Sequence, residues 1–254
     1  MNQYKTSTLT LMCCVAALIP TVARASLIDG SLLHFSGDVQ LGAISTSWNC
    51  NQPGDTACTA APANKGDFAV SASTGSFVEY NGSFGLITDI NNAAQPLNAL
   101  FSLPNFLTFD LNSDLTIELT FIPLGNDTVS TTCAGLSHCT PQNNLLITPN
   151  NPQGLSALNL DSNLSGTALS FGVIGIVHQA GGATAELSGI YTAEFVGLNP
   201  QQTLALVTDG SPTTYSANLS LTLTQTSTPE PASTLLSGIG LLGLGFVGSR
   251  VRRS

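Results

Sequence analysis

Four cysteines between residues 26 and 227 offer the most direct chemistry in this sequence: Cys50, Cys58, Cys133 and Cys139. In an oxidising compartment such cysteines usually form disulfides, and elsewhere the same residue type is a common zinc ligand. Seven residues separate the first pair and five the second, unlike the tight knuckles of zinc sites. Each pair brackets a loop rich in turn-forming residues, so of the three possible pairings we predict Cys50–Cys58 and Cys133–Cys139. A zinc site that includes His138 is the alternative, and we predict no metal.

A second group of possible ligands is formed by Asp110, Asn112 and Asp114, which have the spacing of the first three calcium ligands in an EF-hand loop. The pattern then fails, because Leu115 stands where the loop needs glycine and Phe121 where it needs a bidentate glutamate. We therefore interpret the three residues as polar members of a strand and turn, with calcium binding as the alternative.

Nucleophilic catalysis would need a base beside a serine or cysteine, and the chain has three histidines, His34, His138 and His178. None belongs to a known catalytic or zinc-protease motif, and the sequence has neither a Gly-x-Ser-x-Gly elbow nor a phosphate-binding loop. We predict no catalytic residue and no cofactor. A hydrolase that uses two carboxylates distant in sequence is an alternative, as is a carbohydrate-binding module, although Trp48 is the single tryptophan.

The charge of the chain is unevenly distributed. The whole chain has a formal net charge of −9, yet residues 26–227 hold 14 of the 15 acidic residues and one base, Lys65, which gives −13. Such a surface repels nucleic acid, so we expect no nucleic-acid partner. Solubility is the simplest role of this charge, and binding of divalent cations is the alternative. Hydrophobic residues make up 43% of the chain, too many for a disordered protein.

Residues 1–25 have the three parts of a secretory signal peptide. A basic start precedes an apolar stretch at 9–19, about eleven residues, which is too short to cross a bilayer. Ala23 and Ala25 then satisfy the small-residue rule for cleavage before Ser26. The segment predicts export through the Sec translocon and removal by signal peptidase.

The C-terminal segment, residues 228–254, has three ordered parts. Pro229, Glu230 and Pro231 hold the backbone extended, a form that a peptidase can bind. Residues 232–249 carry no charge and are just long enough to form a single transmembrane helix. Three arginines follow and favour the cytoplasmic side of the membrane, namely Arg250, Arg252 and Arg253.

This order of a Pro-Glu-Pro motif, a Gly- and Leu-rich span and a terminal arginine cluster resembles the PEP-CTERM sorting domain of exosortase substrates. The resemblance covers roughly the last 27 residues. It implies a Gram-negative source, recognition by a membrane exosortase and a link to extracellular polysaccharide or biofilm. It implies no activity for the body, because proteins with this tail have unrelated bodies.

The body, residues 26–227, is predicted to be all-β. Apolar residues alternate with polar ones in several short runs, as half-buried antiparallel strands require, and turn signals separate these runs. The clearest alternating sets are Leu107, Phe109 and Leu111; Ile117, Leu119 and Phe121; Tyr191, Ala193 and Phe195; and Leu219, Leu221 and Leu223. We expect an antiparallel β-sandwich, with weaker strands at 77–80 and 204–208.

These patterns together predict an exported protein that is not an enzyme. We expect a precursor anchored in the inner membrane by its C-terminal helix, then a location at the cell surface or in the extracellular matrix. The expected partners are exosortase, the Sec translocon, signal peptidase and extracellular polysaccharide. A structural or interaction role is the leading hypothesis, ahead of carbohydrate binding and hydrolysis.

Overall fold

The computed structural model describes residues 27–42, 45–50, 64–209 and 217–224, the last range through its backbone alone. The predicted signal peptide and the C-terminal segment lie outside these residues, so the structure tests neither. In the part of the chain that is described, no helix has the length and apolarity needed to cross a membrane.

Strands dominate the described residues. The strands in chain order are β1 (Leu32–Gly37), β2 (Val39–Leu41), β3 (Ser45–Trp48), β4 (Lys65–Val70), β5 (Phe84–Thr88), β6 (Ile90–Asn91), β7 (Leu103–Phe109), β8 (Leu115–Phe121), β9 (Val129–Ser130), β10 (His138–Pro141), β11 (Asn159–Ser162), β12 (Gly166–Gln179), β13 (Thr184–Val196) and β14 (Ala217–Thr224). The helical elements are the 3₁₀ turns η2 (Gly75–Tyr80) and η3 (Asn144–Leu146) and the helix α1 (Pro200–Asp209). The all-β prediction is confirmed.

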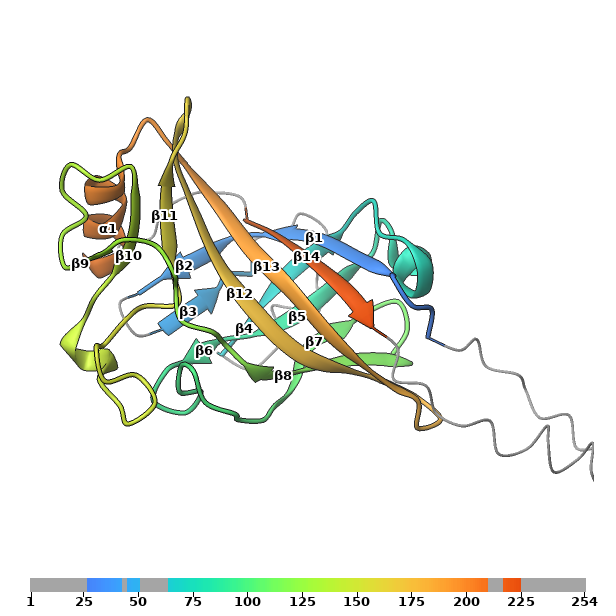
Figure 1. The fold of residues 1–254 in the computed structure, drawn as a ribbon. Coiled ribbons are helices and arrows are strands. Elements are labelled where there is room, and N and C mark those ends of the chain that lie inside the picture. Colours follow the sequence, from blue (N-terminus) through green and yellow to red (C-terminus); the bar gives the residue numbers. More distant parts are fainter. Residues whose placement is uncertain (1–26, 43–44, 51–63, 210–216, 225–254) are drawn as a thin grey trace, which may run out of the picture.

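Eight of the described strands form a closed ring of antiparallel pairs, in the order β12, β13, β14, β1, β4, β5, β7 and β8 (Figure 1). The long hairpin of β12 and β13 closes it, because β12 pairs with β8 on one side and with β13 on the other. A separate sheet contains β2, β3 and β6. The strand pairing therefore differs from the two separate sheets of the expected sandwich, because this hairpin joins the two edges that a sandwich would leave open.

Three of the alternating sets have described side chains, and most of their apolar members lie in the core, although Phe121 is only partly buried. Tyr191, Ala193 and Phe195 of β13 are all at most 4% exposed. Leu111 is an exception at 63% exposed, because β7 ends at Phe109 and Leu111 lies in the following turn. Burial on one face of each strand is the main stabilising term expected for such a sheet.

Aromatic side chains pack the interior of the ring. Trp48, 5% exposed, lies edge-on to Phe106 and to Tyr191, with ring centroids 5.7 Å and 6.3 Å away. Phe171 stacks on Tyr191 at 4.8 Å. The Trp48 backbone also leaves no room for a side chain at Gly66, where an added Cβ would lie 2.3 Å from the Trp48 carbonyl carbon. The core is thus sensitive to the volume of its members.

Two segments expected as weak strands are helical, and those expectations were wrong. Residues 77–80 lie in η2, and residues 204–208 lie in α1. The start of α1 has a reciprocal cap: Asn199 Oδ1 accepts from the Gln202 amide, and Gln202 Oε1 accepts from the Asn199 amide. This capping box, with Pro200 at the first helical position, outweighs the short apolar run that suggested a strand.

The ring has two distinct ends. At one end β1 begins and β14 ends, with Leu32 of β1 opposite Thr222 of β14, and Thr224 of β14 opposite Glu186 of β13. At the other end β11 pairs with the start of β12, near the Glu194 end of β13, and it carries β10 and β9 (Figure 1). Glu194 lies eight residue steps beyond Glu186, which corresponds to about 26 Å along a strand. The β9–β11 extension therefore lies at the opposite end from the point where the chain leaves β14.

Candidate functional site

Several predicted site residues lie outside the described part of the chain. These are the cleavage-site residues Ala23, Ala25 and Ser26, the sorting motif Pro229, Glu230 and Pro231, and the arginines Arg250, Arg252 and Arg253. The first described residue, Leu27, is 2% exposed and belongs to the core. The roles of the cleavage-site residues, the sorting motif and the arginines remain predictions.

The predicted disulfide between Cys133 and Cys139 is confirmed. It joins the segment after β9 to β10, with a Cα–Cα distance of 5.6 Å, and both residues are buried. Cys50 is also disulfide-bonded, and its expected partner Cys58 lies outside the described residues. Because zinc binds thiolates, the Cys133–Cys139 bond removes both sulfurs from the alternative zinc site with His138.

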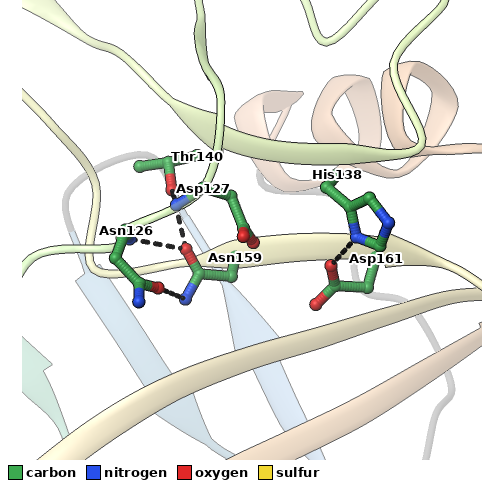
Figure 2. Close-up of polar contacts among 6 residues, drawn as sticks. All are labelled: Asn126, Asp127, His138, Thr140, Asn159 and Asp161. Carbon is green, nitrogen blue, oxygen red and sulfur yellow. Dashed lines mark hydrogen bonds and ion pairs between the residues drawn. The ribbon is translucent and has the colours of Figure 1, made fainter.

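The richest set of polar contacts lies on the solvent-facing side of β10 and β11. We name it the β10–β11 polar cluster, and its members are Asn126, Asp127, His138, Thr140, Asn159 and Asp161 (Figure 2). The strand register creates it: His138 is opposite Asp161, and Cys139 is opposite Leu160. Since alternate residues share a face, Cys139 and Leu160 point to the core and their polar neighbours to the other side.

Asn159 connects one half of the β10–β11 polar cluster. Its Oδ1 accepts from the Thr140 hydroxyl at 2.7 Å and from the Asn126 amide at 3.0 Å, while its Nδ2 donates to Asn126 Oδ1 at 3.1 Å. The Thr140 hydroxyl in turn accepts from the Asp127 amide at 2.9 Å. Figure 2 shows how these bonds tie the 126–127 turn to both strands. The arrangement fixes the Asp127 carboxylate beside the second half of the cluster.

The second half is the pair of His138 and Asp161, whose Nδ1 and Oδ1 lie 2.6 Å apart. This hydrogen bond raises the pKa of His138, and the negative charges of Asp161 and Asp127 add to the effect. Partial burial raises the pKa of Asp127, and the Asp161 charge raises it further. The pair is open to water, with His138 63% and Asp161 38% exposed.

An Asp–His pair can orient a base, but nucleophilic catalysis also needs a hydroxyl or thiol at the other ring nitrogen. Among the described residues, no such group is hydrogen-bonded to His138 Nε2, and the Thr140 hydroxyl donates to Asn159 instead. Within the described residues, the geometry therefore assembles an Asp–His pair without a nucleophile beside it.

The residues with EF-hand spacing form a turn. The Asp114 amide donates to Asn112 Oδ1 at 2.9 Å, and Asn112 Nδ2 donates to Asp114 Oδ2 at 3.2 Å. These local bonds are typical of an Asx-turn between two strands. Within the described ranges, no three His, Cys, Asp or Glu side chains are grouped so as to hold a metal ion.

The other two histidines lie in strands. His178 of β12 pairs with Glu118 of the adjacent β8, at 2.9 Å between Nε2 and Oε2. The pKa of Glu118 is lowered, first by a hydrogen bond from Ser102 and then by His178. His34 lies in β1, where its backbone bonds with Ser73. Neither is near the β9–β11 extension.

A cavity of about 330 Å³ lies between the β9–β11 extension and α1. Its lining side chains are uncharged and divide into polar and aliphatic groups. The lining residues are Gly42, Thr131, Pro141, Gln142, Asn143, Asn144, Leu146, Ser156, Leu158, Leu204, Val207 and Thr208. Pockets that bind small molecules typically begin near this volume.

Comparison with known proteins identifies the tail. The family model described as the PEP-CTERM protein-sorting motif matches residues 227–253. The chain carries a PEP-CTERM sorting motif. This motif indicates an exosortase-sorted protein that is exported to the surface or extracellular space of a Gram-negative type of cell. No curated protein and no solved structure matches the chain significantly.

The PEP-CTERM motif begins three residues after β14, which ends at Thr224. Sequence reasoning found this motif but missed most of the β10–β11 polar cluster, of which it singled out only His138. A signal was present, since His138 and Thr140, like Asn159 and Asp161, are two residues apart and so share one face of a strand. The register that brings the two pairs together is a tertiary property that neither segment specifies alone.

Proposed function

We propose that this PEP-CTERM protein is a non-enzymatic component of the cell surface or extracellular matrix, with a structural or interaction role linked to exopolysaccharide. The observation that carries the proposal is the sorting motif at 227–253, placed directly after the last strand of the closed ring. The Sec translocon and signal peptidase would produce a mature chain that begins at Ser26. Residues 232–249 would hold the exosortase precursor in the inner membrane.

The two ends of the ring support this arrangement. The chain leaves β14 at the end that holds Leu32 and Thr222, whereas the β10–β11 polar cluster and the cavity lie at the other end. A body held through its tail would therefore present the β9–β11 extension away from the membrane. Hydroxyl-bearing side chains such as Ser170, Ser188 and Thr192 face outward on β12 and β13 and suit contact with a hydrated polymer.

The sorting step is tested by replacing Pro229, Glu230 and Pro231 with three alanines. Export depends on residues 1–25, and membrane arrest depends on 232–249 and the arginines, each of which costs roughly 2.5–3.5 kcal/mol at the centre of a membrane. The variant should therefore be exported but accumulate unprocessed in the inner membrane. Fractionation and mass analysis of the products measure this.

A matched control replaces Thr226, Ser227 and Thr228 with alanine, which alters the same number of residues but leaves Pro229, Glu230 and Pro231 intact. The control should be processed like the unaltered chain. Equal mass and location for the Pro-Glu-Pro variant and the unaltered chain would show that the tail is only an anchor.

The matrix role is tested separately by deleting the gene in its own host and measuring cell-bound and released exopolysaccharide. The protein should also co-sediment with that polysaccharide after detergent removes membranes. A protein that is sorted normally but neither co-sediments with polysaccharide nor changes its distribution on deletion would refute the matrix role and leave the sorting intact.

A further inference from the structure

The cavity between α1 and the β9–β11 extension is the described feature best suited to hold a ligand. Three segments supply most of its lining: the chain around Pro141–Leu146, the approach to β11 at Ser156–Leu158, and one face of α1. The Thr140–Asn159 side-chain bond and the backbone bond from the Ser156 amide to the Pro141 carbonyl hold the first two segments together at their base. The walls are therefore fixed by bonds outside the cavity.

Several polar side chains of the lining are anchored by one atom and keep a second atom available. Gln142 Nε2 donates to the Gln153 carbonyl at 2.7 Å, which leaves Oε1 as an acceptor. Asn143 Oδ1 accepts from the Leu145 amide at 2.9 Å, which leaves both Nδ2 hydrogens. Ser156 Oγ accepts from the Leu158 amide at 3.1 Å, which leaves its hydroxyl hydrogen, and the residue is 8% exposed.

Anchoring of this kind reduces the entropy that a side chain loses on binding, because its rotamer is already set. The free atoms include both an acceptor and donors. A ligand that matches them must itself both donate and accept, as a hydroxyl group does. Asn144 lines the cavity and is exposed, and its side-chain amide can likewise both donate and accept hydrogen bonds.

Part of the lining is aliphatic. Leu204 and Val207 of α1, with Leu146 and Leu158, offer a surface of C–H groups, and no aromatic ring among the described residues lines the cavity. The described part of the lining has no charged side chain either, in a body whose formal charge is −13 between residues 26 and 227. An anionic ligand would meet no cation in this lining, and a cationic ligand no carboxylate.

We infer that this cavity binds an uncharged carbohydrate of one or two rings, such as a terminal unit of a neutral polysaccharide. Its hydroxyls meet Gln142, Asn143 and Ser156, and its C–H face packs against Leu204 and Val207. The absence of an aromatic platform from the lining predicts a weak affinity, in the millimolar range. The inference rests on the proposed matrix role for the source of the ligand, but direct titration tests the site alone.

The test uses the mature protein from exporting cells and saturation-transfer NMR with a defined panel. The neutral probes are glucose, galactose, mannose, N-acetylglucosamine, cellobiose and maltose, and the charged probe is glucuronate. At least one neutral sugar should bind, with millimolar affinity, and more tightly than glucuronate. Failure of all neutral probes, or a preference for glucuronate, would overturn the inference even if the sorting and matrix experiments succeed.

Two substitutions locate the binding. Leu204→Trp fills the cavity from α1 and should weaken binding by about tenfold or more, equivalent to 1.4 kcal/mol. Its control is Leu164→Trp at the fully exposed tip between β11 and β12, which should bind as the unaltered protein does. Asn144→Ala should weaken binding several-fold, against the exposed control Asn150→Ala, which lies outside the lining.

The exposed Asn144 variant keeps the test decisive if Leu204→Trp fails to fold, since Asn144 makes no hydrogen bond through its side chain among the described residues. Circular dichroism checks that each variant is folded. Full binding by folded Leu204→Trp, or by Asn144→Ala, would place the sugar elsewhere and refute the site.

Discussion

Replacing Asn159 with alanine probes the centre of the β10–β11 polar cluster. The change removes three hydrogen bonds, two of them to Asn126 and one from the Thr140 hydroxyl. Asn126 is exposed, so water replaces its lost partners at little cost. Thr140 is fully buried, and loss of the acceptor for its hydroxyl costs about 1–3 kcal/mol. We expect the free energy of unfolding to fall by about 2–3 kcal/mol in total.

The assay is urea unfolding of the mature protein followed by the fluorescence of Trp48, the single tryptophan of the chain. A double-mutant cycle isolates the buried bond. In a Thr140→Val background the hydroxyl is already absent, so Asn159→Ala should cost only about 0.5–1 kcal/mol. The coupling energy between the two positions should therefore be about 1–2 kcal/mol. Additive losses, with no coupling, would refute the reasoning that Thr140 depends on Asn159.

Three further changes test other parts of the structure. Replacing both Cys133 and Cys139 with serine should lower the free energy of unfolding by about 2 kcal/mol, which is the loop entropy expected for a separation of 6 residues. A urea unfolding curve that the double substitution leaves unchanged would contradict this. The pKa of His138 is raised in the folded protein, so its pairing with Asp161 stabilises the fold. This stabilisation is complete at a pH below the ordinary histidine pKa, and it is lost as the pH rises through the raised pKa of the folded state. NMR titration should show the His138 pKa falling toward its ordinary value in Asp161→Asn, and an unchanged pKa would rule out Asp161 as the cause. Gly66→Ala should destabilise the fold by about 1–3 kcal/mol and shift the Trp48 emission, because the new Cβ meets the Trp48 backbone. The control is Gly82→Ala, where the new Cβ enters open space and should leave the Trp48 emission unchanged.

Local patterns in the sequence predicted the strands with clear alternation. Tyr191, Ala193 and Phe195 lie on one buried face as expected, because a period of two is a property of each strand by itself. The cysteine pair at 133 and 139 was also predictable, since the two members are only 6 positions apart in the sequence.

The remaining features depend on contacts between distant segments. Closure of the ring needs the register between β12 and both of its neighbours, and no local pattern encodes it. The cavity needs α1, and the alternation-based reading of 204–208 as a strand overlooked the capping box at Asn199 and Gln202. The β10–β11 polar cluster likewise combines residues up to 35 positions apart, from Asn126 to Asp161.

The pairing of β1 with β14 has a consequence for the order in which the protein folds. β1 is held by six residue pairs to β14 but by only two to β4, so most of its hydrogen bonds await a strand about 190 residues later in the chain. Closing a loop of that length costs roughly 5 kcal/mol of chain entropy, which makes this pairing a late event.

During export, β1 leaves the translocon long before β14 and meanwhile presents an open edge to other chains. The sorting motif follows β14, so it is made and moved after this strand. In the proposed processing, a cut at the Pro-Glu-Pro motif would leave the chain with the strand that covers this edge, whereas a cut a few residues earlier, within β14, would release a chain prone to pair with its neighbours.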